Sequence, residues 1–303
     1  MKVLVVGVGV IGTVYGAQLG AAAHAVSVLA HGSRTGAVDH EGLRAHDVLT
    51  DVVTHAPATV LDHLADDAFD LVLVTVRRDD LHLVSPQLAG LSGQPLVLFF
   101  GNNPGGRVGL PADIPGVVCM GFPGVGGTLQ AGIAEYVRLP QQPTALDNSA
   151  DPRLKELEDA LRSRGFSVER VADMSGWLEY HALFVACISA ALYRSQVDPQ
   201  RLADNRHELT LMCQAITEGF GALRAQGVVG LPRNLAVLHS RWLRPVAIRY
   251  WAHSMRSPMG ELAFAAHSRH AETEMRALAR DVVARVVQGN DPPSLSRLLT
   301  EHQ

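Results

Sequence analysis

The stretch Lys2-Val-Leu-Val-Val-Gly7-Val-Gly9-Val-Ile-Gly12 decides the fold of the N-terminal half of this 303-residue chain. A short apolar run leads directly into three glycines with the spacing GxGxxG, and a helical pattern follows. A second apolar run, Ala25–Ala30, completes a strand–helix–strand unit. Because glycine-rich turns without a ligand lack this context, the stretch predicts a Rossmann-type dinucleotide-binding unit.

Each glycine of this loop has a separate expected role. Gly7 permits the tight turn, Gly9 lets the backbone approach a pyrophosphate, and Gly12 lets the helix pack closely on the strand. The helix N-terminus then presents free N–H groups and a positive dipole end to the phosphates. We therefore expect the pyrophosphate to lie against one continuous loop, made of Gly7, Val8, Gly9, Val10, Ile11 and Gly12.

The end of the second strand indicates which dinucleotide binds. It reads Leu29-Ala30-His31-Gly32-Ser33-Arg34, and no acidic residue follows until Asp39. NAD-binding proteins usually place Asp or Glu here, on the ribose 2′-hydroxyl, whereas a 2′-phosphate favours hydroxyl and guanidinium groups. Arg77 and Arg78, after the apolar run Leu71–Val76, are expected beside the same pocket, although each could be a solvated surface charge. The sequence favours NADP(H), with the adenosine side formed by His31, Ser33, Arg34, Val76 and Arg77.

The first half of the chain alternates apolar runs with helical patterns. Continuous runs of about five β-branched or leucine residues are typical of strands buried on both faces of a parallel sheet. The clearest are Lys2–Val6, Ala25–Ala30, Leu71–Val76 and Leu96–Phe100, and further strands are expected at Val117–Met120 and Phe166–Val171. The glycine-rich stretch Gly121–Thr128 is expected to be a loop.

From about Met174 the pattern becomes helical. Long helices are expected at Trp177–Tyr193, Glu208–Gln226, Leu235–His253 and Glu261–Val287, with prolines between them. The predicted fold class is α/β: a Rossmann domain with a doubly wound, mostly parallel sheet at 1–172, then an all-α domain at 173–303 for substrate binding and dimerisation. The long apolar helices suggest a homodimer, although an intrachain core explains them equally well.

Composition limits the partners and the compartment. A net charge of −4 gives no reason to expect nucleic acid or an anionic membrane as partner. Three widely spaced cysteines without a CxxC pair argue against a disulfide framework or a structural zinc site, and favour the cytoplasm. No signal peptide or transmembrane stretch is recognisable. His267, His270 and Glu274 have a spacing that a metal could use, but an amphipathic helix explains it better, so no metal is predicted.

Four segments together resemble the ketopantoate reductase (2-dehydropantoate 2-reductase) family: Gly7–Ala17, Val26–Arg34, Val74–Arg77 and Asn102–Gly105. The resemblance is specific over the first ~110 residues and loose in the helical half. It implies reduction of a 2-oxo acid by NADPH, between a Rossmann domain and a helical domain. It also implies that Arg77 stands where the family has a Lys on the 2′-phosphate, and that Asn102 contacts nicotinamide and substrate.

The helical half departs from the family pattern. The family places Lys, Asn and Asn four residues apart after a Trp, and counting from Trp177 these positions are Glu179, Leu183 and Cys187. Leu183 and Cys187 would form an apolar wall in place of the amides. Glu179 and His181 remain as candidate catalytic residues on this helix. His181 could act as a general acid near neutral pH or be a helix-surface or core-edge residue. Glu179 could be a solvated charge or form an interdomain salt bridge.

Two later positions complete the candidate site by resemblance. His253-Ser254-Met255 looks like the family's Ser-Ser-Met segment, and Glu261 is similar to its substrate-binding Glu. The preferred interpretation is an NADPH-dependent reductase of a small-molecule carbonyl compound, either 2-oxo acid-like or a larger, more apolar ketone. One alternative is an imine or opine-type C=N reductase. Another is a catalytically silent NADP-binding protein. Turnover separates the enzymes from the silent protein, and dependence on an amine separates the two enzymes.

Overall fold

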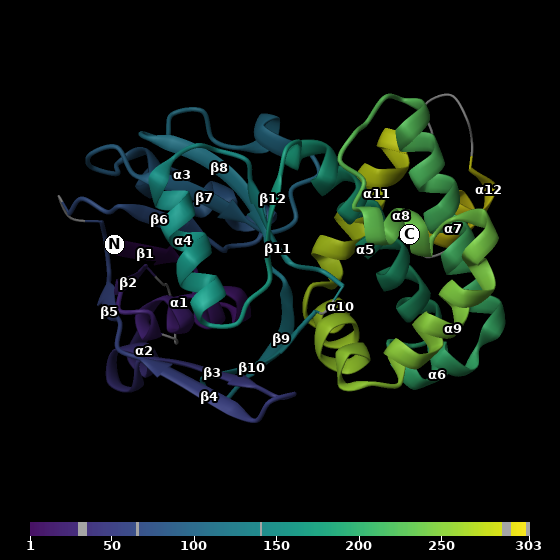
Figure 1. The fold of residues 1–303 in the computed structure, drawn as a ribbon, viewed down its shortest axis with the longest axis horizontal. Helices are drawn as coiled ribbons and strands as arrows, with labels where there is room; N and C mark the ends of the chain where they lie inside the picture. Colours follow the sequence, from purple (N-terminus) through teal and green to yellow (C-terminus); the bar gives the residue numbers. More distant parts are fainter. Residues whose placement is uncertain (30–34, 65–66, 140, 287–291, 301–303) are drawn as a thin grey trace. The chain divides into compact units, whose positions relative to one another are not determined.

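The computed structural model describes residues 1–29, 35–64, 67–139, 141–286 and 292–300. The chain forms two compact units (Figure 1). The first comprises Met1–Asn102 and Arg107–Ala172, and the second comprises Asn103–Gly106 and the chain from Asp173 onward. The first unit is built on a mostly parallel sheet and the second is helical, so the predicted fold class is confirmed.

The first unit contains an eight-stranded sheet in which all neighbours pair in parallel except β8 and β11. Its order is β12 (Val168–Val171), β11 (Thr144–Asp147), β8 (Val117–Phe122), β7 (Leu96–Phe100), β6 (Leu71–Val74), β1 (Lys2–Val6), β2 (Ala25–Leu29) and β5 (Thr59–Leu61). The order reverses direction on either side of β1, as in a doubly wound fold.

Both faces of this sheet are covered, which explains its continuous apolar strands. On β1, Val3 and Val5 belong to the core shared with α1 (Val10–Ala21) and α4 (Pro152–Ser163). Leu4 and Val6 belong to the core on the other face, shared with α3 (Leu81–Ala89). Successive side chains of β1 point to opposite faces of the sheet, and those on both faces are buried.

A second, four-stranded sheet lies against α1, with the order β4 (Val52–Ala56), β3 (Leu43–Asp47), β10 (Ile133–Arg138) and β9 (Val125–Gln130). Helix α1 therefore lies between the two sheets (Figure 1). The expected loop at Gly121–Thr128 is wrong, because these residues belong mainly to β8 and β9. Gly127 is a strand residue whose added Cβ would lie 2.2 Å from the Glu135 carbonyl oxygen, so glycine serves close strand contact there.

The remaining elements of this unit are short. They are α2 (Thr35–Glu41) and the 3₁₀ turns η1 (Arg78–Asp80) and η2 (Gly106–Gly109).

The start of α1 approaches β1 and β6 so closely that only glycine fits. A Cβ on Gly12 would lie 2.0 Å from the Gly7 carbonyl oxygen and 2.7 Å from Thr75 Oγ1. By contrast, a Cβ on Gly9 would meet nothing within 4 Å. Gly12 is thus needed for packing, whereas Gly9 faces open space.

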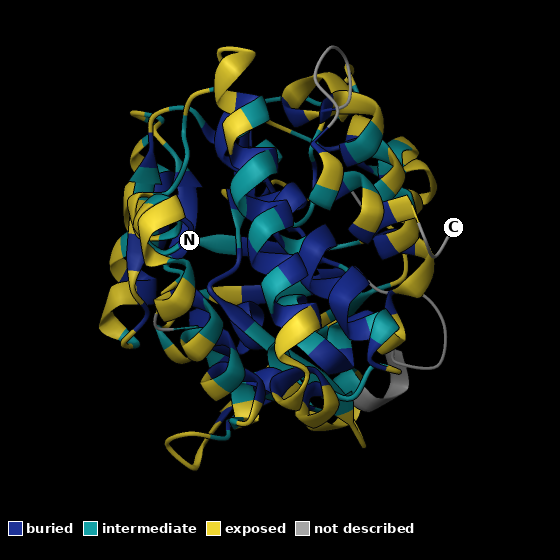
Figure 2. Ribbon diagram, turned by 90° about the vertical axis from the view of Figure 1, so that its right-hand side faces the viewer, coloured by how far each residue is buried: buried dark blue, intermediate teal, exposed yellow. Residues whose placement is uncertain are grey.

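Helix α5 (Met174–Arg194) forms the core of the helical unit. It packs against α7 (Arg206–Ala225), α11 (Glu272–Val286) and α12 (Pro293–Thr300), and most of its residues are buried. Figure 2 shows the whole ribbon coloured by the burial of each residue. Within the described residues, α5 is the one helix that is long and apolar enough to cross a membrane, and 83% of its most apolar window is buried in the protein.

Two helices expected to be continuous are interrupted. The stretch Leu235–His253 becomes α8 (Arg233–Leu238), η3 (Arg241–Leu243) and α9 (Arg244–Met255), because Pro245 occupies the first turn of a new helix. The stretch from Glu261 becomes a π-helix (Gly260–Ala265), α10 (Ala266–His270) and α11. A short α6 (Pro199–Asp204) connects α5 and α7.

A buried histidine links three of these helices. The indole Nε1 of Trp251 donates to His239 Nε2 at 3.4 Å, and Thr217 Oγ1 donates to the His239 carbonyl at 3.0 Å. His239 is 4% exposed, and burial lowers its pKa from 6.5 to about 4. The folded protein therefore holds this imidazole neutral at pH values where the unfolded chain would protonate it.

Gly12→Ala should destabilise the first unit, because the added methyl group overlaps the Gly7 carbonyl. We expect the free energy of unfolding, measured by urea denaturation, to fall by about 1–3 kcal/mol. Gly9→Ala is the matched control and should unfold as the wild type does. Equal midpoints for the two variants would contradict the assigned packing.

Stability should fall as the pH drops from about 6.5 to about 4, because the unfolded state takes up a proton at His239 that the folded state refuses. This one group contributes a slope of up to about 1.4 kcal/mol per pH unit. In the variant His239→Gln, the free energy of unfolding should fall less steeply over the same pH window. Above pH 7 the substitution should not alter the pH dependence. Identical slopes for wild type and variant would show that His239 is not held neutral.

Candidate functional site

The glycine loop between β1 and α1 is held by backbone and side-chain contacts. Gly7 has a φ of +95°, and its N–H donates to the Leu29 carbonyl at 3.0 Å. The Thr75 hydroxyl donates to the Gly7 carbonyl at 2.6 Å. A Cβ on Gly7 would lie 2.8 Å from Val76 Cγ1, so Val76 packs directly against the turn. The loop is thereby tied to the ends of β2 and β6.

The beginning of α1 fits a phosphate group. Gly9 is the N-cap residue, and no side chain caps the helix there. The first helix turn contains no acidic residue that would repel an anion. N–H groups at a helix N-terminus carry a partial positive charge, and the open space beside Gly9 leaves room for a ligand to approach them. Val8 is buried, whereas Val10 and Ile11 are partly buried against the unit's core. The loop can therefore hold a pyrophosphate through its backbone.

The residues expected around the adenosine are only partly described. His31, Ser33 and Arg34 lie outside the described residues. Arg77 is exposed and caps η1, directly after Val76. Because β6 pairs with β1, this arginine lies at the same strand ends as the glycine loop.

Asn102 follows β7 at the point where the chain leaves the first unit. It is partly buried, and the next residue, Asn103, is buried and donates to the Gly106 carbonyl at 2.6 Å. Gly106 has a φ of +55° and lies against Ser175, near the start of α5. The short segment Asn103–Gly106, directly after Asn102, is thus closed by an internal hydrogen bond and approaches Ser175 at Gly106.

Glu179 forms a salt bridge with Arg285 of α11, with Arg285 Nε 2.9 Å from Glu179 Oε2. Arg285 also contacts the side-chain oxygen of Gln226. Glu179 and Arg285 both belong to the helical unit, so the salt bridge forms within that unit and the expectation of an interdomain bridge is wrong. Sequence inspection missed Arg285, because it lies 106 residues away and no local pattern marks it.

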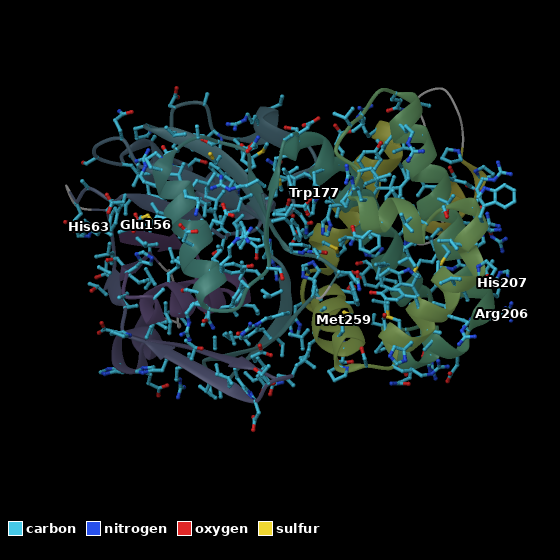
Figure 3. The ribbon with its side chains drawn as sticks, viewed as in Figure 1. His63, Glu156, Trp177, Arg206, His207 and Met259 are labelled. Atoms are coloured by element: carbon cyan, nitrogen blue, oxygen red, sulfur yellow. The ribbon has the colours of Figure 1, made fainter. Side chains whose placement is uncertain are left out.

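His181 is 2% exposed and stacks on Trp177, with ring centroids 4.9 Å apart (Trp177 is labelled in Figure 3). Burial, with a smaller contribution from His267, lowers the pKa of His181 from 6.5 to about 3. The expectation of a general acid that needs little tuning near neutral pH is therefore wrong. The imidazole is neutral at that pH and can act only as an uncharged hydrogen-bonding group.

Leu183 and Cys187 do not form the expected apolar wall. Both are fully buried in the core of the helical unit. A Cβ on Gly219 of α7 would lie 2.4 Å from Leu183 Cδ1, so Leu183 packs directly on α7. These two residues therefore stabilise the helical core.

Ser254 and Glu261 have different surroundings. Ser254 is buried on α9, and its carbonyl accepts a hydrogen bond from the Ser257 hydroxyl at 2.7 Å. Glu261 lies in the π-helix, where Arg269 donates to both of its carboxylate oxygens at 2.6 and 2.9 Å. The Glu261 charge is thus balanced by an arginine eight residues later.

Thr75 is a further loop residue that sequence inspection missed. Its hydroxyl bonds the carbonyls of Val6 and Gly7, and its side chain would block any residue larger than glycine at position 12. The available signal was a hydroxyl side chain immediately after the buried strand β6.

Among the described residues, no three His, Cys, Asp or Glu side chains gather as a metal site. All three cysteines are buried and free.

The model of the ketopantoate reductase PanE/ApbA family matches residues 3–130. Comparison with curated proteins gives no match. Solved structures with the same fold include a PanE/ApbA family ketopantoate reductase from Ralstonia eutropha JMP134, with 21% identity and a TM-score of 0.77, covering 99% of this chain and 97% of that one.

Two further structures extend the comparison. D-mandelate dehydrogenase in a ternary structure with NADH and anilino(oxo)acetate has 14% identity and a TM-score of 0.72, covering 99% of this chain and 96% of that one. A dimeric ketopantoate reductase from Staphylococcus aureus has 13% identity and a TM-score of 0.64, covering 99% and 97%. At these identities the structures establish the fold. Residues 3–130 are thus similar to the ketopantoate reductase PanE/ApbA family, and the whole chain has the fold of ketopantoate reductase and D-mandelate dehydrogenase structures.

Proposed function

We propose that this protein reduces the carbonyl group of a 2-oxo acid-like compound with NADPH. The observation that carries the proposal is the uncapped start of α1 beside open space at Gly9, in a domain that matches an oxidoreductase family. A bound nicotinamide supplies the hydride. The protein's own contribution is to hold the dinucleotide through the glycine loop and to bind the developing oxygen charge.

The preference for NADPH rests on charge. The sequence after β2 offers Ser33 and Arg34 without an acid before Asp39, and Arg77 follows β6 at the same strand ends. Guanidinium groups bind phosphate oxygens strongly, and a carboxylate would repel them. The D-mandelate dehydrogenase structures hold NADH, so the proposed preference for NADPH rests on this chain's own residues.

The catalytic helix is proposed to have diverged from the family pattern. Glu179 stands where a lysine is expected, and its charge is engaged by Arg285. Neutral His181 would then serve as an uncharged hydrogen-bond donor, together with Asn102, Ser254 and Glu261 as candidate contacts to substrate or nicotinamide. Loss of a charged acid lowers the driving force for protonation, which favours substrates with an activated carbonyl.

The substrate is proposed to be larger or more apolar than ketopantoate. Since Leu183 and Cys187 lie in the core, they do not support this, and the support comes from the similarity to D-mandelate dehydrogenase. That structure contains anilino(oxo)acetate, an oxo acid derivative that carries an aromatic ring, and this supports a larger, more apolar substrate for the present protein.

The proposal also covers assembly and cellular compartment. A dimeric relative exists, so we propose a homodimer formed through the helical domain at 173–303, next to the NADP-binding domain at 1–172. Three buried, unpaired cysteines are consistent with a reducing cytoplasm.

Arg77→Ala should weaken NADPH binding by about ten- to a hundredfold, since a hydrogen bond to a charged group contributes about 1.5–3 kcal/mol. NADH binding should change less than threefold, because NADH lacks the 2′-phosphate. Arg162→Ala, which removes a half-exposed arginine from α4, is the control. Equal losses for both cofactors would exclude a phosphate contact at Arg77.

Consumption of NADPH, followed at 340 nm, tests the reaction. We expect faster turnover with benzoylformate, the 2-oxo acid that corresponds to mandelate, than with ketopantoate. The rate should not depend on added amine. Turnover only in the presence of an amine would replace the proposal with C=N reduction, and no turnover with either acid or with imines would favour a silent binding protein.

The neutral state of His181 predicts a pH profile. Because the pKa of His181 is lowered to about 3, this residue should cause no change of log kcat near pH 6.5. Wild type and His181→Asn should therefore have the same pH profile in that region. A limb near pH 6.5 present in the wild type and absent in the variant would show that the imidazolium form is the acid.

A further inference from the structure

Positive charge is concentrated in one segment of the helical unit. Residues 219–260 contain six arginines and no acidic residue, whereas the whole chain has a net charge of −4. The arginines are Arg224, Arg233, Arg241, Arg244, Arg249 and Arg256. The small net charge of the protein therefore conceals a segment whose charged residues are all positive.

The turn between α8 and α9 projects apolar side chains into solvent in the middle of this segment. Trp242 is 90% exposed, Val237 59%, Val246 54% and Leu243 36%. These four residues lie within ten positions of one another, on α8, η3 and the first turn of α9, which contact each other. We call them the α8–α9 tip. An exposed tryptophan among aliphatic residues is costly in water, so this cluster points to a binding surface.

The tip is joined to the core of the helical unit. Ala247 and Trp251 of α9 belong to that core, and His239, between α8 and η3, is buried against the Trp251 ring. The turn itself is closed by Leu243 N–H donating to the Ser240 carbonyl at 3.1 Å. Trp242 is therefore exposed on a turn whose neighbouring residues are anchored in the core.

The arginines around the tip are not neutralised in the described residues. Arg233, Arg241 and Arg249 are exposed and form no ion pair there, whereas Arg256 pairs with Asp204 at the far end of α9. The tip thus combines bulky apolar groups with a surrounding positive charge. This is the chemistry of a surface that inserts between anionic headgroups.

We propose that the α8–α9 tip docks on an anionic lipid membrane surface. Trp242 and its aliphatic neighbours enter the headgroup boundary, where tryptophan is favoured, and Arg233, Arg241 and Arg249 contact lipid phosphates. A second copy of the chain related by twofold symmetry would bring the same arginines together, which disfavours self-association through this face. An acidic protein would also complement the charge. Protrusion of Trp242 from a turn favours the lipid surface.

The protein contains a built-in reporter for this docking. Of its three tryptophans, Trp177 is 5% and Trp251 3% exposed, so only Trp242 is open to solvent. The full chain is mixed with phosphatidylglycerol vesicles or phosphatidylcholine vesicles at low salt. We expect a blue shift of tryptophan emission and co-sedimentation with phosphatidylglycerol alone, both reduced at high salt.

Substitutions separate the two contributions. Trp242→Ala should abolish the blue shift and weaken vesicle binding at least tenfold. Each of Arg241→Ser and Arg249→Ser should weaken binding about fivefold, as expected for one arginine at an anionic surface. The matched controls are Leu49→Ala, which removes an exposed apolar residue from the first unit, and Arg280→Ser, an exposed arginine of α11. Both should bind as the wild type does.

Three outcomes would overturn the proposal. Absence of binding to phosphatidylglycerol vesicles would exclude the lipid surface and favour an acidic protein as the partner of the tip. Binding that Leu49→Ala and Arg280→Ser weaken as much as the tip variants would be non-specific. A Trp242→Ala variant that changes from dimer to monomer in sedimentation velocity, with vesicle binding intact, would identify the tip as an interface between copies.

Discussion

The rest of the first unit depends on the close approach of α1 to the sheet at Gly12. The distance available there excludes every side chain, because the Gly7 carbonyl and the Thr75 hydroxyl occupy the position of a Cβ. This contact fixes where the helix begins and brings its first N–H groups to the ends of β1 and β6. It also leaves Gly9 facing open space. One packing constraint therefore sets the turn from β1 into α1 and leaves the start of that helix accessible at Gly9.

The parts of the fold that were predictable are those in which one local requirement dominates. Lys2–Val6 and Leu96–Phe100 are apolar along their whole length because both sheet faces are covered. The second sheet escaped prediction because a strand such as Leu43–Asp47 alternates buried and partly buried residues and includes Arg44 and His46. The strand at Gly127 was predicted as a loop, because glycine is favoured both where strands approach closely and where a loop is flexible.

The candidate site divides along the same line. Residues of the glycine loop could be recognised because their spacing, together with the strands and helix around them, is a local sequence pattern. On α5, function depends on partners distant in sequence, which spacing does not reveal. Glu179 forms an ion pair with Arg285, His181 is held neutral by burial, and Leu183 packs on Gly219. A helix position is therefore insufficient to tell a pocket residue from a core residue.

The central claim is that the glycine loop holds a dinucleotide with a 2′-phosphate. Equilibrium titration of the wild-type protein with NADPH and with NADH, followed by nicotinamide fluorescence, measures this without assuming a substrate. The account predicts saturable binding of both, with NADPH bound at least tenfold more tightly. Absence of binding by either dinucleotide would show that the loop serves packing alone, and the proposed reductase would fall with it.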